Sequence, residues 1–457
     1  MNDQYPELYS SFRWLVPSQF NIAQYCLLRW ASNTLEGRRP AVFAENEFGE
    51  TTVRTFGQLA ETTGKLANGL LKMGIGRGDR VAVAMGQSPE YITACMAILA
   101  VGAIVVPIPT ILNAKQVTER LSHAQARAAI IDMPHAPGIL QAYGQYPGLS
   151  QIISFGFQHE LTLSWSSLLA RQNSDLHVAL TLSSSPAFLL YPIGPTPTLK
   201  GVVLPHSALI GVLPGFVASQ NWFPQSKDIF WTQHYWTHID GLLGGLLPCL
   251  YFGRPIVALD GHLSTRQTIE CLQKYKVTNV SLPYSSLRAV MEEPHADFNG
   301  LSVRAIMSTG EHPSEQVHEW CENTLGLTPN HVYGQTEAPY IIGHSHVRWP
   351  ARPGSMGKAF PGHLVTVLDD AGRPCPAGVS GQIAVNRYDI HGFPDPALFL
   401  GYWQDDASTQ QTFLRDWYLT GECARIDRDG YFWYVGHHSN NESHVTAKRN
   451  GSVSLSL

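Results

Sequence analysis

The sequence predicts an α/β fold, with parallel sheets flanked by helices and a smaller β subdomain after them. In the first third of the chain, apolar strand-like runs alternate with amphipathic helical patterns. That alternation is typical of a parallel sheet covered by helices on both faces. After Gly362 the pattern changes to short strands broken by turn signals at 369–372 and 374–378. Such spacing favours antiparallel hairpins.

The first clear helix is expected to begin at Thr55, because Thr55 and Gln58 make a capping-box signature. Leu59 and Leu70 lie on its apolar face, and Gly74 ends it. The next elements are predicted as a strand over 81–85, a helix from 89, a strand over 103–106, a helix over 118–123 and a strand over 128–131. A second passage joins a helix over 268–275 to strands over 277–282 and 304–308.

The longest apolar stretch, 91–109, resembles a membrane span in length, but Gly102 and Pro107 divide it. Pro89 in front of it is typical of a first helical position. We therefore expect a buried helix and strand there, and no membrane span. The N-terminus lacks the basic start and apolar run of a signal peptide.

Composition narrows the function classes. The 457 residues are 44% hydrophobic and 15% charged, with a net charge of -5 and no Lys/Arg run, which argues against a nucleic-acid partner. The seven cysteines form no Cys-x-x-Cys pair, so reduced core thiols are expected rather than zinc ligands. Together these features favour a cytoplasmic protein.

The most informative string is Tyr333-Gly334-Gln335-Thr336-Glu337, preceded by Ser308-Thr309-Gly310-Glu311 after a predicted strand. The strings that follow are Arg352-Pro353-Gly354-Ser355-Met356-Gly357, Gly401-Tyr402-Trp403, Leu419-Thr420-Gly421-Glu422 and Asp429-Gly430-Tyr431-Phe432-Trp433. In this order they resemble the motifs of the adenylate-forming (AMP-binding) acyl-CoA synthetase superfamily, medium-chain and aromatic-acid branch. The resemblance covers residues 20–436.

The resemblance implies a reaction and its residues. In that superfamily a carboxylate attacks the α-phosphorus of ATP in the presence of Mg²⁺, and a thiol of CoA or of a carrier protein then takes the acyl group. By resemblance, the adenine would stack on Tyr333 beside Gly334 and would be bordered by Gly310 and Glu311. Thr336 would donate to the α-phosphate, and Glu337 would supply a hard oxygen to Mg²⁺.

The phosphate loop departs from the superfamily pattern. A Gly/Ser/Thr-rich run is expected, but residues 191–201 contain Pro192, Pro195 and Pro197. Three prolines remove three N–H donors and stiffen the backbone. Thr196, Thr198 and Lys200 remain able to meet phosphate. The sequence is compatible with a loop that binds phosphate and equally with a proline-rich connection that binds no ligand.

Two further positions depart from the pattern. Glu422 stands where the ribose-binding Asp is expected, one methylene longer. His437 stands where an Arg is expected, and histidine is shorter and titrates near about 6.5. Glu422 can still accept from hydroxyls, but a displacement of about 1 Å can cost about a hundredfold in rate. The histidine predicts weaker contact with the nucleotide.

The predicted domain organisation follows from the same resemblance. Residues 1–436 correspond to the AMP-binding N-terminal domain, with α/β subdomains to about 360 and the β subdomain at about 361–436. The superfamily continues through a hinge into a C-terminal domain that supplies a catalytic lysine. Here 437–457 is a polar tail instead, and Lys448 lacks the surrounding motif. The sequence therefore predicts that this domain is absent.

The acyl pocket is expected around His234, Tyr235, Trp236 and His238, in the stretch that lines the carboxylate pocket by resemblance. His234 and His238 have the i, i+4 spacing that binds a metal on a helix. No third ligand is evident in the sequence, so aromatic pocket lining is the favoured reading.

Two functions remain open from the sequence. The first is an enzyme that activates a medium-chain or aromatic carboxylic acid, with the missing domain supplied by another protein or the adenylate passed to an acyl-carrier protein. The second is a non-catalytic relative that keeps the fold for acyl binding or partner docking. A truncated gene product is a third reading of the short C-terminus.

Overall fold

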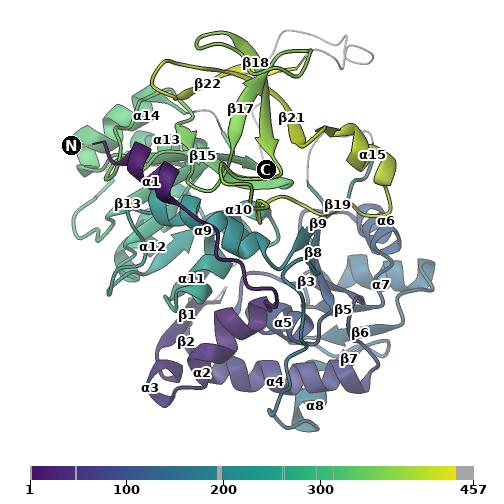
Figure 1. The fold of residues 1–457 in the computed structure, drawn as a ribbon. Coiled ribbons are helices and arrows are strands. Elements are labelled where there is room, and N and C mark those ends of the chain that lie inside the picture. Colours follow the sequence, from purple (N-terminus) through teal and green to yellow (C-terminus); the bar gives the residue numbers. More distant parts are fainter. Residues whose placement is uncertain are drawn as a thin grey trace.

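The computed structural model describes residues 3–46, 49–192, 198–259, 261, 263–294, 296–311 and 313–438. Two large mixed sheets lie side by side, helices pack around them, and a smaller antiparallel sheet sits across their common edge (Figure 1). This is the α/β architecture with a β subdomain that the sequence predicts.

The first large sheet has the strand order β19-β9-β8-β4-β3-β5-β6-β7. Its central strands β4, β3 and β5 run parallel, and helices join them in the chain. The strands are β3 (Arg80–Ala84), β4 (Ile104–Pro107), β5 (Ala128–Ile131), β6 (Gln151–Ser154), β7 (Leu163–Ser164), β8 (Pro186–Leu190), β9 (Val202–Pro205) and β19 (Gly401–Tyr402). The helices are α4 (Phe56–Lys72), α5 (Pro89–Ala100), α6 (Ala114–Ala124), α7 (Ala136–Gln145) and α8 (Trp165–Ala170).

Local signals begin these helices where the sequence predicts. At α4, the Gln58 N–H donates to Thr55 Oγ1 at 3.2 Å, and the Thr55 N–H donates to Gln58 Oε1 at 3.0 Å. The helix predicted over 118–123 is longer, because a second capping box between Asn113 and Gln116 begins α6 at Ala114.

The apolar stretch 91–109 forms most of buried α5 and all of buried β4. No helix in the described part of the chain is long and apolar enough to cross a membrane.

The second large sheet has the order β16-β15-β14-β13-β12-β10-β11-β1-β2. Its strands are β1 (Pro40–Glu45), β2 (Thr51–Thr55), β10 (Phe230–Thr232), β11 (Ile256–Leu259), β12 (Asn279–Ser281), β13 (Ala305–Thr309), β14 (Asn330–Gln335), β15 (Ala338–Gly343) and β16 (Lys358–Ala359). Because β12, β13 and β14 are parallel, their carboxyl ends lie at one edge of the sheet. The strings at 308–311 and 333–337 lie at that edge.

Helices and single turns complete the two large layers. They are α1 (Tyr5–Ser11), η1 (Gln24–Leu28), α2 (Arg29–Ala31), α3 (Thr34–Gly37), α9 (Ala208–Ser219), α10 (Ile239–Gly241), η2 (Leu242–Leu246), α11 (Leu247–Tyr251), α12 (Thr265–Lys274), α13 (Tyr284–Glu292), α14 (Glu315–Trp320) and η3 (Cys321–Leu325). The strand predicted over 277–282 is shorter than expected, since only 279–281 pairs within the sheet.

The β subdomain has the order β17-β18-β21-β20, and β22 also pairs with β21. It comprises β17 (Val365–Leu368), β18 (Ser380–Asn386), β20 (Phe413–Leu414), β21 (Trp417–Ile426) and β22 (Phe432–His437), and α15 (Asp406–Gln411) lies beside it. All its pairings are antiparallel, as the turn signals predict. One apolar core cluster extends from the large sheets into this subdomain and holds it against the edge of β14. Residues 439–457 of the predicted tail lie outside the described residues.

Candidate active site

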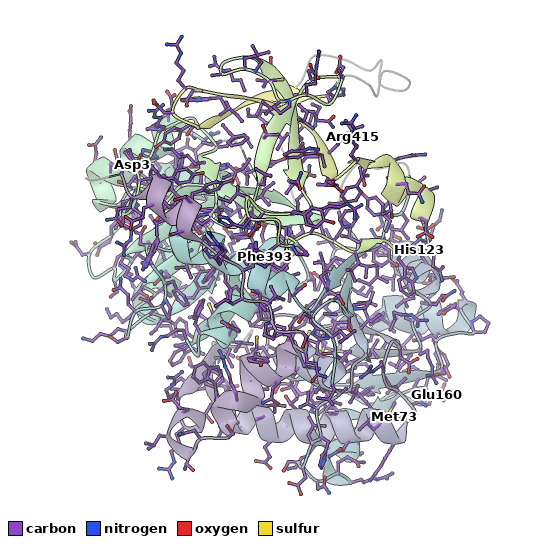
Figure 2. The ribbon with its side chains drawn as sticks, viewed as in Figure 1. Asp3, Met73, His123, Glu160, Phe393 and Arg415 are labelled. Carbon is purple, nitrogen blue, oxygen red and sulfur yellow. The ribbon has the colours of Figure 1, made fainter. Side chains whose placement is uncertain are left out.

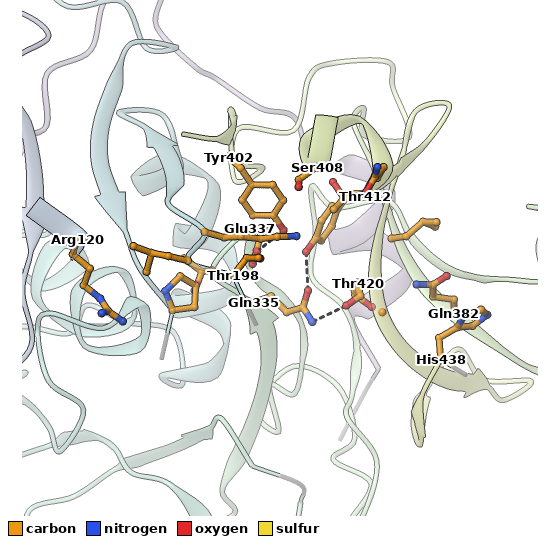
Figure 3. Close-up of a pocket in the computed structure, with 18 of the residues that line it drawn as sticks. Arg120, Thr198, Gln335, Glu337, Gln382, Tyr402, Ser408, Thr412, Thr420 and His438 are labelled. Atoms are coloured by element: carbon orange, nitrogen blue, oxygen red, sulfur yellow. Dashed lines mark hydrogen bonds between the residues drawn. The ribbon is translucent and has the colours of Figure 1, made fainter. Parts of the chain in front are cut away.

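A cavity of about 980 Å³ opens where the β subdomain meets the two large sheets. Figure 3 shows Arg120 at one end, Thr198, Glu337 and Gln335 in the middle, and Thr420, Gln382 and His438 at the other end. Its lining residues are Gln116, Glu119, Arg120, Pro192, Thr198, Leu199, Lys200, Gln335, Thr336, Glu337, Gln382, Tyr402, Ser408, Gln411, Thr412, Tyr418, Leu419, Thr420, Gly421 and His438. Four predicted site residues, Thr198, Lys200, Thr336 and Glu337, are therefore brought together.

Tyr402 joins Glu337 to Lys200 in the middle of this cavity. The pairing of β19 with β9 sets Tyr402 opposite Val202, two residues after Lys200. The Tyr402 hydroxyl donates to Glu337 Oε1 at 2.9 Å, and Lys200 Nζ lies 4.7 Å from the centre of the Tyr402 ring. Burial raises the pKa of Glu337, while the hydrogen bond from Tyr402 and the charge of Lys200 oppose that rise. The site thus combines a cation with a half-buried carboxyl group.

Tyr333 and Glu422 form a second group, next to the far end of the cavity. The Tyr333 hydroxyl donates to the Glu422 carboxylate. Gln335 Nε2 donates to the Thr420 carbonyl at 3.0 Å, and the Tyr418 hydroxyl donates to Gln335 Oε1 at 2.9 Å. Burial and the Glu422 charge raise the pKa of Tyr333 well above its usual range. These bonds tie β14 to β21 across the two layers.

Gly334 has a packing reason to be glycine. A Cβ at this position would lie 2.4 Å from the Tyr340 backbone nitrogen, too close for any other residue without a shift of β15. The glycine therefore keeps Tyr333 and Gln335 close to the neighbouring strand.

His437 lies opposite Glu422 in the β21–β22 register, but the histidine whose side chain lines the cavity is His438. His438 donates its N–H to the Gly421 carbonyl at 2.9 Å, and its Nε2 lies 3.2 Å from Asp370 Oδ1.

Gly310 and Glu311 follow β13, outside the lining of this cavity. Gly310 has φ +82°, a conformation that favours glycine. The Glu311 carboxylate accepts the Ser285 N–H at 2.6 Å and the Ser285 hydroxyl at 2.5 Å. Its side chain is thus bonded to the start of α13.

His234 and His238 do not lie on a helix. His238 is the residue before α10, and its Nδ1 accepts the Asp240 N–H at 3.4 Å and lies 3.3 Å from Asp240 Oδ2. The i, i+4 spacing therefore does not place the two imidazoles on one helix face, because 233–238 forms bends and a turn. Among the described residues, no group of three or more His, Cys, Asp or Glu could hold a metal ion.

Tyr235 and Trp236 line a separate cavity of about 250 Å³ together with Gln87 and Tyr91. Trp236 is buried, and the Tyr91 hydroxyl donates to its carbonyl at 3.0 Å. The predicted acyl-pocket residues therefore do not share one cavity. Tyr235 and Trp236 line this one, whereas the His238 side chain contacts Asp240. Thr196, also predicted to meet phosphate, lies outside the described residues.

Sequence reasoning assigned no role to Tyr402, Gln335, Tyr418 or Arg120. Tyr402 and Gln335 stand inside the quoted strings, so motif neighbours are the signal that could have found them. Arg120 belongs to an amphipathic helix without any motif, and only the tertiary structure places it in the cavity.

The donor set of the cavity fits a magnesium–nucleotide complex. Mg²⁺ is usually held by one or two carboxylates together with phosphate oxygens, rather than by an all-protein cage. Glu337 and Thr336 provide a carboxylate and a hydroxyl beside the cation Lys200. The volume also falls within the range of ligand pockets.

The chain belongs to the AMP-binding enzyme family, because the model of that family matches residues 28–403. It is 28% identical over 439 residues to the uncharacterized acyl-CoA ligase YtcI of Bacillus subtilis (strain 168), covering 92% of this chain and 77% of that protein. It is also 28% identical over 442 residues to the mitochondrial acyl-coenzyme A synthetase ACSM5 of Homo sapiens, covering 94% and 74%.

Solved structures confirm the fold. An acyl-CoA synthetase from Brucella canis superposes with a TM-score of 0.86 at 22% identity, covering 96% of this chain and 80% of that one. The anthranilate CoA ligase AuaEII, in complex with anthranoyl-AMP, gives 0.83 at 23% identity, covering 92% and 79%. The family match and the acyl-CoA ligase and synthetase relatives confirm the resemblance predicted from the motifs.

Proposed function

We propose that this protein activates a carboxylic acid with ATP. A carboxylate oxygen of the acid attacks the α-phosphorus, the bond to pyrophosphate breaks, and an acyl-adenylate forms. The acyl group then passes to the thiol of CoA or of a carrier protein. The observation that carries the proposal is the convergence of Lys200, Thr336 and Glu337 on one cavity, with the Tyr333–Glu422 pair beside its far end.

The proposed roles follow from side-chain chemistry. Lys200 faces the negative phosphates as a point charge. Thr336 donates to the α-phosphate, and Glu337 holds Mg²⁺, which supplies positive charge to the phosphates when bound. Tyr333 carries the adenine, and Glu422 accepts from the ribose hydroxyls.

The acid is proposed to be medium-chain or aromatic. The buried Trp236 and the half-exposed Tyr235 offer apolar and aromatic surface along the predicted acyl stretch. Relatives named as ACSM acyl-CoA synthetases and as an anthranilate CoA ligase support the same class. The cysteines of the described residues are free thiols, which supports the reducing cytoplasm as the compartment.

A non-catalytic role is the second candidate, and one observation favours it. The Glu422 carboxylate already accepts from Tyr333, and Gln335 Nε2 lies 3.4 Å from the same oxygen. A carboxylate bonded in this way has less capacity left for ribose hydroxyls. The fold would then serve acyl binding or partner docking.

Thermal unfolding of the purified protein distinguishes the enzymatic from the non-catalytic function. It is measured with Mg-ATP, alone and together with a panel of medium-chain fatty acids and benzoates. A ligand at about 100 times its Kd stabilises by about 2.7 kcal/mol. Lys200→Met is expected to lose the ATP shift. Lys274→Met, which removes an exposed cation paired with Glu45 outside the cavity, keeps it.

The enzymatic proposal further expects acid-dependent release of pyrophosphate from ATP. A shift with acids but not with ATP, or no shift at all, favours the non-catalytic role.

A further inference from the structure

Arg120 is a buried cation, and among the described residues no carboxylate lies within ion-pair distance of its guanidinium. It is 8% exposed, on the same face of α6 as Val117, Leu121 and Ala124. Its Nη1 donates to the Gln116 carbonyl at 3.1 Å, and its Nε is buried with no hydrogen-bond partner in the described part of the chain. An arginine carries five N–H donors and remains charged, so burial without an anion is unfavourable.

The neighbours of Arg120 hold its side chain in place. The guanidinium carbon lies 5.9 Å from the centre of the Tyr191 ring, and the Tyr191 hydroxyl is 2.9 Å from His123 Nδ1. The Trp403 indole N–H donates to the His123 carbonyl at 3.1 Å. His123, labelled in Figure 2, belongs to the last turn of α6, one turn after Arg120. The Tyr191 ring, itself fixed by His123, therefore orients the Arg120 cation without neutralising it.

The position of Arg120 in the cavity suggests what neutralises it. Arg120 lines the same cavity as Thr198 and Lys200, at the end opposite Thr420 and His438 (Figure 3). Glu119 also lines it and attracts Arg120 through its charge, but its carboxylate is turned to a solvent-exposed pair with Lys115 at 3.9 Å. A nucleotide whose adenosine lies toward Tyr333 and Glu422 therefore extends its phosphates toward Arg120.

We propose that Arg120 is an anion-binding residue of this cavity, whose guanidinium receives the terminal phosphates of ATP and the pyrophosphate released from it. The proposal rests on the proposed function for the orientation of the nucleotide. Prolines at 195 and 197 offer no N–H to an anion. A forked guanidinium supplies donors of the kind that those prolines lack.

Calorimetric titration tests this assignment. Inorganic pyrophosphate, ATP and AMP are titrated into the wild type and into Arg120→Met, Arg120→Lys and Lys115→Met. Arg120→Met keeps an apolar stem but removes the charge. Lys115→Met removes the same charge from an exposed site on the same helix, 86% exposed and outside the cavity. Circular dichroism checks that each variant is folded.

In Arg120→Met, the affinity for pyrophosphate and ATP is expected to fall about tenfold to a hundredfold, the usual range for a hydrogen bond to a charged group. AMP, which lacks the terminal phosphates, keeps its affinity, and Lys115→Met behaves as the wild type. If Arg120→Met does not fold, Arg120→Lys replaces it. Its affinity for pyrophosphate is expected to fall several-fold, because an ammonium group lacks the paired N–H donors of a guanidinium.

Unchanged pyrophosphate affinity in the folded Arg120 variants overturns the assignment while leaving the proposed function standing. Wild-type protein that binds neither pyrophosphate nor ATP overturns both. A selective loss at Arg120, in a protein that releases no pyrophosphate with any acid, supports the anion site and contradicts the enzymatic proposal.

Discussion

Glu337 is a half-buried carboxyl group in the middle of the cavity. Burial disfavours its charged form, and the Tyr402 hydroxyl and Lys200 favour it. A divalent cation adds a stronger favourable charge at the same place. The carboxylate is therefore suited to a metal that arrives together with phosphates.

Replacing Glu337 with Gln is expected to abolish the Mg²⁺-dependent part of the ATP thermal shift, because an amide oxygen carries no net charge. The measurement is the shift with ATP in the presence and absence of Mg²⁺. Glu311→Gln is the matched control, since that carboxylate is bonded to Ser285. An unchanged Mg²⁺ effect in Glu337→Gln would show that the metal role is wrongly assigned.

Tyr402 offers a second prediction at the residue scale. Tyr402→Phe keeps the ring beneath Lys200 but removes the hydroxyl that donates to Glu337. A hydrogen bond to a charged group contributes about 1.5–3 kcal/mol, so Mg-ATP affinity measured by calorimetry should fall about tenfold or more.

Tyr402→Leu removes the ring contact as well, and its loss should exceed that of Tyr402→Phe. Equal affinity in the wild type and Tyr402→Phe would mean that the hydroxyl does not position Glu337.

Among the structural elements, the connection between β8 and β9 is the most unusual by sequence. It must serve as a phosphate loop if the protein binds ATP, yet Pro192, Pro195 and Pro197 remove three N–H donors. Lys200 and Thr198, at its carboxyl end, still line the cavity. The element thus keeps its charged end but lacks three of its backbone donors.

Changing Pro192, Pro195 and Pro197 to Ser, Gly and Gly is expected to tighten ATP binding, because N–H donors and backbone freedom return together. Calorimetry on the triple variant measures the effect. Pro376→Gly, in an exposed turn of the β subdomain, is the control. Unchanged ATP affinity in the triple variant would show that the loop does not limit binding.

At the scale of the whole molecule, buried histidines connect stability to pH. His206 is fully buried, and its Nδ1 accepts the Ile22 N–H at 3.2 Å. Burial lowers the pKa of His206 to about 4, and burial also lowers the pKa of His344. These imidazoles are neutral in the folded chain, whereas they titrate near about 6.5 when it unfolds.

The unfolded state therefore binds more protons between about pH 6.5 and pH 4, and the free energy of unfolding falls as the pH is lowered through that window. His206 alone accounts for about 3 kcal/mol of that fall, because its pKa is about 4 in the folded chain and about 6.5 in the unfolded chain. Urea unfolding at a series of pH values measures the slope. His206→Asn keeps an acceptor for Ile22 and should flatten the slope, and an equally steep slope in that variant would contradict this account.

The sequence by itself determined the class of fold, the family and several helix starts. Capping at Thr55 and alternating apolar runs are local properties, because they depend on residues within one or two turns of each other. The strings at 308–311 and 333–337 were recognisable for the same reason, since each is contiguous in the chain.

Only the tertiary structure decided which of these residues meet. Tyr402 reaches Glu337 because β19 pairs with β9, and Tyr333 reaches Glu422 because the β subdomain packs against β14. Arg120 lines the cavity because α6 buries that face, and the turn before α10 separates His238 from any helical partner. Strand pairing and packing join residues far apart in the chain, and no local pattern encodes such contacts.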